Sequence, residues 1–172
     1  MSDTNRRFEE IALPHLSAAH NLARWLTRND HDAEDMVQEA YLRAFKFFDS
    51  FRGEDGRAWL LAIVRNTCYT WLKQNRVQEL HDSFDEDIHS EADSSGNPQS
   101  LMLQNANKKL LNRGIEALPL EFREILIMRE LEDLSYKEIA TVAGIPIGTV
   151  MSRLARARNM LRTSLEQIMQ EK

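Results

Sequence analysis

An acidic stretch without helical periodicity divides the chain, and this division limits the fold more than any other feature of the sequence. The residues from Glu79 to Asp93 include seven acidic side chains and no basic one, and the turn formers SSGNP follow at 94–98. Apolar residues are few there, so the stretch cannot build a core of its own. We predict a flexible linker over 78–100 between two domains, 1–77 and 101–172. A solvated loop within one domain is the alternative, although loops of this length are uncommon inside compact domains.

Apolar residues recur at spacings of three and four on both sides of this linker, which is the pattern of amphipathic helices. No segment has the two-residue alternation of a convincing strand. The sequence therefore predicts an all-α fold made of two small helical domains. The expected helices cover about 8–26 with a break at Pro14, 32–48, 57–75, 101–117, 121–131, 136–143 and 146–166.

Three residues near the C-terminus have the spacing of a helix-turn-helix. A small residue is needed where the two helices cross, a positive φ in the turn, and an apolar anchor in the second helix. Ala140, Gly144 and Val150 occupy these positions. Ser135 is the expected N-cap of the first helix, and Pro146 favours the start of the second.

The second of these helices is strongly basic. Between Ile147 and Arg162 there are four arginines and no acidic residue. Arginine can read guanine with two hydrogen bonds or bind phosphates, and the front of such a helix enters the DNA major groove. An ordinary surface helix with a solvated basic face is the alternative, but the helix-turn-helix spacing favours DNA binding.

The net charge of −5 at first argues against a nucleic-acid partner. However, residues 1–78 carry 11 basic and 11 acidic side chains, and residues 94–172 carry 11 basic and nine acidic ones. The acidic stretch alone therefore accounts for more than the whole negative charge. The two predicted domains remain compatible with DNA.

Several classes of protein are excluded by what the sequence lacks. The single cysteine, Cys68, cannot form an internal disulfide, and the apolar runs are too short to span a bilayer. The N-terminus has no apolar core of a secretory signal. We expect a cytoplasmic protein without membrane insertion. The sequence also has no zinc-ligand spacing, nucleophile–base set or glycine-rich phosphate loop, so we expect no enzyme activity, no metal and no cofactor.

Five motifs, in order along nearly the whole chain, resemble the sigma factors of bacterial RNA polymerase, of the extracytoplasmic-function (ECF) group. Residues 148–158 (GTVMSRLARAR) resemble the recognition helix of region 4 of this family, and residues 118–124 (LPLEFRE) resemble the start of that domain. Residues 32–44 (DAEDMVQEAYLRA) resemble the polymerase-binding helix of region 2. The motif FRG at 51–53 and the motif formed by WL at 59–60 with RNT at 65–67 resemble the part that engages the promoter −10 element.

This resemblance implies that the chain binds core RNA polymerase and directs it to promoter DNA. The residues expected to read the −35 element as duplex are Gly148, Thr149, Met151, Ser152, Arg153, Arg156 and Arg158. The residues expected to hold the opened −10 strand are Phe51, Arg52, Gly53, Arg65, Asn66 and Tyr69. The residues expected to bind polymerase are Asp32, Glu34, Asp35, Gln38, Glu39 and Arg43. Trp59 and Trp71 have the spacing of core residues instead.

The resemblance also implies a monomer that is controlled by an anti-sigma factor. Within the −35 set, we expect Ser152 and Arg153 to approach bases, and Arg156 and Arg158 to contact phosphates. Two other readings remain. The chain is either a helix-turn-helix regulator that acts without being a polymerase subunit, or a helical adaptor with no role on DNA.

Overall fold

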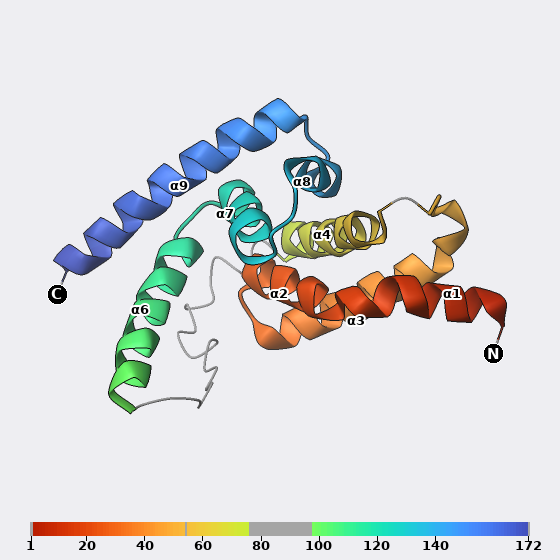
Figure 1. Cartoon of the computed structure of the whole chain (residues 1–172), viewed down its shortest axis with the longest axis horizontal. Coiled ribbons are helices and arrows are strands. Elements are labelled where there is room, and N and C mark those ends of the chain that lie inside the picture. Colours follow the sequence, from red (N-terminus) through yellow and green to blue (C-terminus); the bar gives the residue numbers. More distant parts are fainter. Residues whose placement is uncertain (1, 54, 76–97, 172) are drawn as a thin grey trace.

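The computed structural model describes residues 2–53, 55–75 and 98–171, and all regular structure in these ranges is helical (Figure 1). This confirms the prediction of an all-α fold. The predicted linker lies largely outside the described residues. The helix that follows it begins at Pro98, close to the expected linker end at residue 100.

Within residues 2–53 and 55–75, the structure has four α-helices and two short 3₁₀ segments. They are α1 (Asp3–Ala12), η1 (Leu13–His15), α2 (Leu16–Thr27), α3 (Asp30–Lys46), η2 (Phe48–Ser50) and α4 (Gly56–Gln74). The expected break at Pro14 is confirmed, because a proline in this position has no backbone N–H to continue the helix. The N-cap of α3 is Asn29, whose side chain accepts a hydrogen bond from the Asp32 backbone at 2.9 Å.

The C-terminal half contains α6 (Pro98–Glu116), α7 (Leu120–Leu126), η4 (Ile127–Leu131), α8 (Tyr136–Ala143) and α9 (Ile147–Gln170). The helix expected over 121–131 changes its hydrogen-bond pattern midway, because η4 is a π-helical segment. The long helix α9 crosses the top of the molecule, and the end of α6 packs against its C-terminal part (Figure 1). A Cβ on Gly114 of α6 would lie only 2.8 Å from the Leu165 side chain, so glycine allows this close approach.

The helix-turn-helix has the predicted geometry. Ser135 caps α8 in a capping box, in which its side chain accepts from the Glu138 backbone and the Glu138 side chain accepts from the Ser135 backbone. Gly144 ends α8 with φ of 69°, a left-handed conformation that glycine adopts at little cost. Val150 is fully buried behind the turn.

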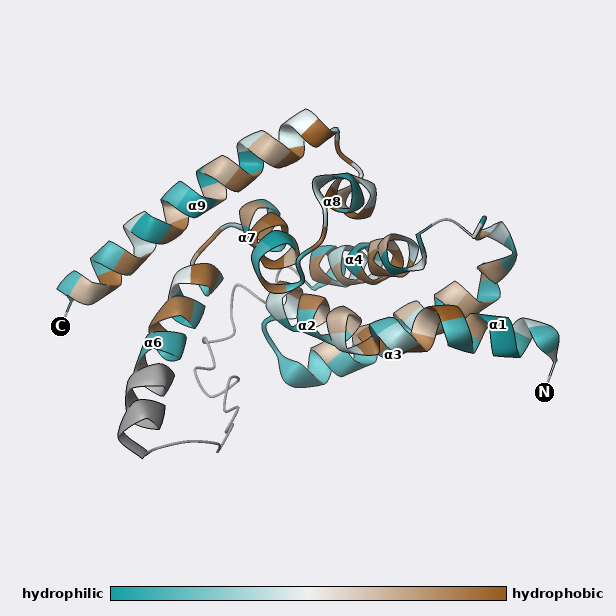
Figure 2. Cartoon of the chain, in the orientation of Figure 1, coloured by the Kyte–Doolittle hydropathy of each residue, from teal (hydrophilic) through white to brown (hydrophobic). Residues whose placement is uncertain are grey.

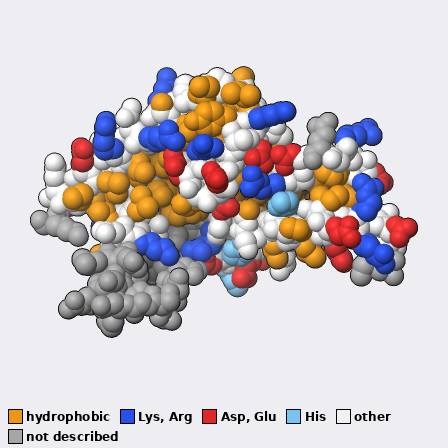
Figure 3. Space-filling view, in the orientation of Figure 1, with side chains coloured by type: hydrophobic (Ala, Val, Ile, Leu, Met, Phe, Trp, Pro, Cys, Tyr) orange, Lys and Arg blue, Asp and Glu red, His pale blue; other side chains and the backbone are white. Residues whose placement is uncertain are grey.

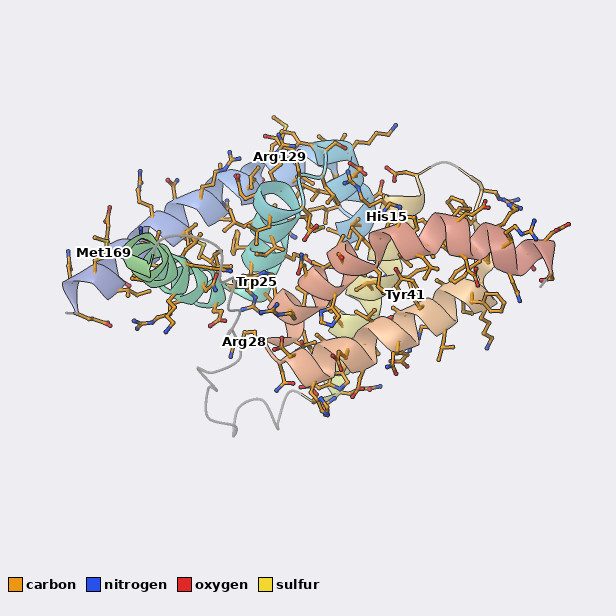
Figure 4. All side chains as sticks on the ribbon, turned by 60° about the horizontal axis from the view of Figure 1, so that its bottom comes forward. His15, Trp25, Arg28, Tyr41, Arg129 and Met169 are labelled. Atoms are coloured by element: carbon orange, nitrogen blue, oxygen red, sulfur yellow. The ribbon has the colours of Figure 1, made fainter. Side chains whose placement is uncertain are left out.

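The two halves of the chain share one apolar core. Leu26 of α2 and Leu61 of α4 are buried in the same cluster as Ile125 of α7 and Ile139 of α8. In Figure 2 the helices α2, α4, α7 and α8 gather at the centre of the molecule, where residues of all four contribute to this cluster. A second, aromatic cluster around Phe8 and Phe48 fixes α1 against α3 and α4. The Tyr41 hydroxyl, labelled in Figure 4, strengthens this end by donating to the Ala12 carbonyl at 2.7 Å.

Two glycines of the helix-turn-helix should respond to alanine in opposite directions. We expect Gly144→Ala to lower the free energy of unfolding by about 1–2 kcal/mol, because the new Cβ must adopt the left-handed conformation. We expect Gly148→Ala to raise it by about 0.5–1 kcal/mol, because Gly148 lies in α9 with open space around its Cα. Urea denaturation measures both values. Equal effects of the same sign would contradict this interpretation of the turn.

Candidate nucleic-acid interface

The N-terminal half of α9 presents the predicted −35 residues on its outer face. Gly148, Met151, Ser152, Arg156 and Arg158 are exposed, and Thr149 and Arg153 are half-buried. The opposite face is fixed by its apolar side chains, because Val150, Leu154 and Ala157 are buried against α7 and α8. In Figure 3, Lys and Arg side chains gather along the edge of the molecule where α9 lies.

Arg158 has a partner within its own half of the chain. Its guanidinium donates two hydrogen bonds to the same Glu130 oxygen, at 2.6 and 2.9 Å. Both side chains are about half exposed, and exposed ion pairs contribute only about 0–1 kcal/mol. Breaking this pair costs little free energy, so a DNA phosphate can take the place of Glu130 beside Arg158.

The predicted −10 residues form two groups. Phe51, Arg52 and Gly53 lie in the loop before α4, where Gly53 has φ of 80°. Arg65, Asn66 and Tyr69 lie on α4, with Arg65 about 14 Å along the helix axis from its first residue, Gly56. The structure brings the members of each group together, and the two groups lie apart along α4.

The loop group is supported by an aromatic cluster. The rings of Phe51 and Trp59 lie 4.9 Å apart, and Phe48 lies 6.1 Å from each of them. Trp59 is half-buried within this cluster, while Trp71 is half-buried against the main core. Both tryptophans thus have a packing role, as their spacing predicts.

In the second group, on α4, Arg65 is bound by a side chain from the C-terminal half. The Arg65 guanidinium donates two hydrogen bonds to the Glu124 carboxylate, at 2.9 and 3.1 Å, and lies 3.8 Å from the centre of the Tyr69 ring. Glu124 is fully buried. Burial is the largest single influence on the pKa of Arg65 and lowers it, but the hydrogen bond and charge of Glu124 together with Tyr69 outweigh burial, so this pKa is raised. Burial and then the Glu124 carboxylate raise the pKa of Tyr69.

A second ion pair joins the halves near the start of α4. Arg57 donates to both carboxylate oxygens of Glu138, at 2.8 and 3.0 Å. Burial raises the pKa of Glu138, but hydrogen bonds from Arg57 and the Ser135 backbone outweigh this effect and hold the pKa at about 2. Glu132 accepts a further hydrogen bond from the Asn21 side chain at 2.9 Å. We name the contact formed by these three pairs the interdomain seam.

The predicted polymerase-binding residues follow the exposed face of α3. Glu34, Asp35, Gln38, Glu39 and Arg43 are exposed, Asp32 is half-buried in the first turn, and Arg43 pairs with Glu39 at 3.1 Å.

Sequence reasoning missed Leu42, whose exposed fraction of 72% is high for a leucine. It lies one turn after Gln38 on the same face of α3. The exposure of Leu42 could have been predicted from the sequence, because this residue lies outside the apolar stripe formed by Met36, Val37, Ala40 and Ala44.

The geometry described above is that of a DNA-binding protein, because a helix-turn-helix carries an exposed basic helix front. Comparison with known proteins identifies the family. Residues 12–77 match the model of sigma-70 region 2, and residues 108–161 match that of sigma-70 region 4. The chain belongs to the ECF sigma factors of RNA polymerase.

Individual relatives agree with this assignment. The ECF RNA polymerase sigma-E factor of Escherichia coli K12 is 36% identical over 143 residues, which cover 78% of this chain and 74% of the relative. The sigma-E factor of Haemophilus influenzae is 34% identical over 155 residues, which cover 86% of this chain and 81% of that one.

Two solved structures have the same fold. One is the sigma factor RpoE of Bartonella quintana, crystallised with the anti-sigma factor NepR. Its TM-score is 0.75 at 28% identity, over 94% of this chain and 98% of that one. The other is CnrH in complex with the cytosolic domain of CnrY, with a TM-score of 0.66 at 22% identity, over 95% of this chain and 90% of that one.

In the described part of the chain, no helix combines the length and the apolar character needed to cross a membrane. Within the same residues, no three His, Cys, Asp or Glu side chains are grouped so that they could hold a metal ion.

The interdomain seam predicts a pH dependence of stability. His15 lies where the break between α1 and α2 meets α4 and α8 (Figure 4). Burial and then the Arg57 guanidinium lower its pKa below the ordinary value of 6.5. Its contribution to stability is therefore complete above pH 6.5 and is lost as the pH falls below this value, because the unfolded chain then binds the proton more readily.

We expect His15→Gln to lose less stability than the wild type between about pH 7.5 and about pH 5.5 in urea denaturation. His31→Gln is the matched control, since His31 is exposed on α3. Parallel losses in wild type and His15→Gln would contradict the prediction.

Proposed function

We propose that this chain binds core RNA polymerase, directs it to specific promoters and helps to open the −10 element. The exposed, arginine-bearing front of α9 carries the proposal, because the helix-turn-helix behind it leaves this front free to enter a major groove. Because the chain belongs to the ECF sigma factors, we assign core RNA polymerase as the partner that it brings to DNA. The protein acts as a transcription initiation factor without catalytic activity of its own, in the cytoplasm, where polymerase and DNA are found.

The positions along α9 support a division between base and phosphate contacts. Ser152 and Arg153 lie in the second turn, close to the end that enters the groove, and are assigned to bases. Arg156 and Arg158 lie further along the helix, toward the edge of the groove, and are assigned to phosphates. Gly148, Thr149 and Met151 complete the surface that faces the duplex.

The −10 element is assigned to the N-terminal half, which we propose extends over 1–77. A base removed from the stack needs a pocket whose contacts offset a cost of a few kcal/mol. Phe51, Arg52 and Gly53 are exposed or half-buried in a loop backed by aromatic rings, which supports a role in holding such a base. Arg65, Asn66 and Tyr69 are assigned to the strand beyond it.

An anti-sigma factor is proposed as the regulatory partner. The Bartonella quintana relative was crystallised with the anti-sigma factor NepR, and it aligns with 94% of this chain. We propose that the chain is a monomer that exchanges this partner for polymerase.

Reconstitution with core polymerase tests the function. The purified chain is expected to form a complex with core polymerase and to direct run-off transcription from promoters that its overproduction activates. A second candidate, a regulator that is not a polymerase subunit, predicts specific binding to promoter duplex without polymerase and no stable complex with it. That result would overturn the proposal.

The exposed leucine of α3 should contribute to the polymerase interface. We expect Leu42→Ala to weaken the binding of core polymerase about tenfold with no loss of stability, because an exposed apolar side chain gains most when a partner buries it. Fluorescence titration with labelled protein measures the affinity. Leu13→Ala is the control, since Leu13 is 51% exposed outside α3. Equal losses in both variants would contradict a specific role of α3.

Alanine in place of different arginines of α9 should cause different defects in promoter binding. We expect Arg153→Ala to cost about 1–3 kcal/mol of promoter binding by the holoenzyme and to relax the preference at one base pair. We expect Arg156→Ala to weaken binding equally on all sequences and to reduce the slope against salt by about one. Arg162→Ala, beyond the helix front, is the control. Identical behaviour of the first two variants would contradict the assignment.

A further inference from the structure

We propose that α1 forms one wall of the site for the opened −10 strand, and that its Arg7 binds a phosphate of that strand. The inference rests on the proposed function, because it takes the loop of Phe51, Arg52 and Gly53 as the place of an unstacked base. Arg7 lies before residue 12, where the match to the model of sigma-70 region 2 begins, so the family match does not cover it.

The segment from Phe48 to Gly56 lies beside one face of α1 (Figure 1). Its end meets Ile11, because a Cβ on Gly56 would lie only 2.9 Å from the Ile11 Cγ2 atom. Arg7 lies one turn before Ile11 on the same face, since residues four apart are neighbours on a helix. The guanidinium carbon of Arg7 lies 5.4 Å from the centre of the Phe48 ring, where the segment begins. The face that carries Arg7 and Ile11 therefore borders the loop at both of its ends.

A row of aromatic rings leads from Arg7 to the loop. The Phe48 ring stacks on the Phe51 ring at 6.1 Å with 15° between their planes, and Phe51 lies 4.9 Å from Trp59. Phe51 is half-buried and Arg7 is exposed, so both can be reached from solvent. Proteins bind single strands with this combination, in which rings stack on bases and cations contact the backbone.

The helix that carries Arg7 is fixed in place by its buried face. Phe8 packs edge-on against the rings of Phe45 and Phe48, with ring centres 5.2 and 5.4 Å apart. At the end of α1, the Tyr41 hydroxyl donates to the Ala12 carbonyl at 2.7 Å. A cation on a rigid element loses less freedom on binding than one on a mobile loop, so Arg7 is well placed to position a strand.

No carboxylate among the described residues forms an ion pair with Arg7, although Asp3 and Glu10 lie about one turn away on α1. In the loop, the Asp55 carboxylate accepts a hydrogen bond from the Ala58 backbone at 3.0 Å and caps α4. A phosphate can therefore bind Arg7 without displacing a carboxylate.

Binding of opened promoter DNA by the reconstituted holoenzyme tests the inference. The probe is a labelled fork-junction DNA from a promoter that overproduction of the chain activates, duplex over the −35 element and single-stranded from the −10 element onward. We expect Arg7→Gln to lower the affinity for this probe about fivefold. The slope of log affinity against log salt should fall by about 0.7, because one phosphate contact to a single strand is lost.

The salt series separates a strand contact from a packing role. If Arg7 only supported the aromatic rings, Arg7→Gln would lower the affinity by the same factor at every salt concentration. Arg7→Lys keeps the positive charge and should therefore keep the wild-type slope.

Two controls show whether the effect belongs to this position and to the opened strand. Arg6→Gln removes the same charge from an exposed position of α1, on the side away from the buried Phe8 and Ala12, and should keep the wild-type affinity and slope. A duplex probe that ends upstream of the −10 element should bind equally to the wild-type and Arg7→Gln holoenzymes.

Four results would overturn the role of Arg7. They are wild-type affinity and slope in Arg7→Gln, a loss of affinity with an unchanged slope, an equal loss in Arg6→Gln, and an equal loss on the upstream duplex. Run-off transcription by the wild-type holoenzyme tests the function separately. Its absence would overturn the proposed function and the inference with it, whereas transcription together with any of the four results would overturn only the inference.

Discussion

The structure depends on the burial of α4 between two sets of helices. Leu61, Val64 and Cys68 are completely buried in the core that both halves of the chain share. Burying a large apolar side chain contributes about 1.5–3 kcal/mol, so these contacts, rather than the ion pairs beside them, supply the attraction between the halves. The ion pairs of the interdomain seam determine the register in which the two apolar surfaces meet. Opening the seam thus exposes apolar surface, and a stable open form requires a partner that covers it.

The local elements could be predicted from the sequence because their causes are local. Pro14 interrupts a helix wherever it occurs, Ser135 and Glu138 form a capping box within one turn, and Gly144 provides the left-handed turn of the helix-turn-helix. The buried face of α9 follows from the spacing of Val150, Leu154 and Ala157 alone. The −35 surface was predictable for the same reason, since it is the other face of that helix.

The relations between distant residues could not be predicted in this way. Arg65 and Glu124 are separated by 59 positions, and each has the appearance of a surface residue in its own helix. Their pairing appears only when α4 and α7 are placed side by side. The change to π-helical geometry at Ile127 likewise has no marker in the apolar spacing. The assignments of single residues to bases, phosphates and polymerase remain predictions.

The close approach of α6 and α9 at Gly114 fixes the far end of the long helix. With 24 residues, α9 is about 36 Å long, and its N-terminal half carries the proposed DNA surface. Its C-terminal part packs on α6, where Leu161 and Leu165 approach Gly114. Its N-terminal part packs on α7 and α8 through Val150, Leu154 and Ala157. Because α9 is held along its length, its front cannot turn in the groove unless α6, α7 and α8 turn with it.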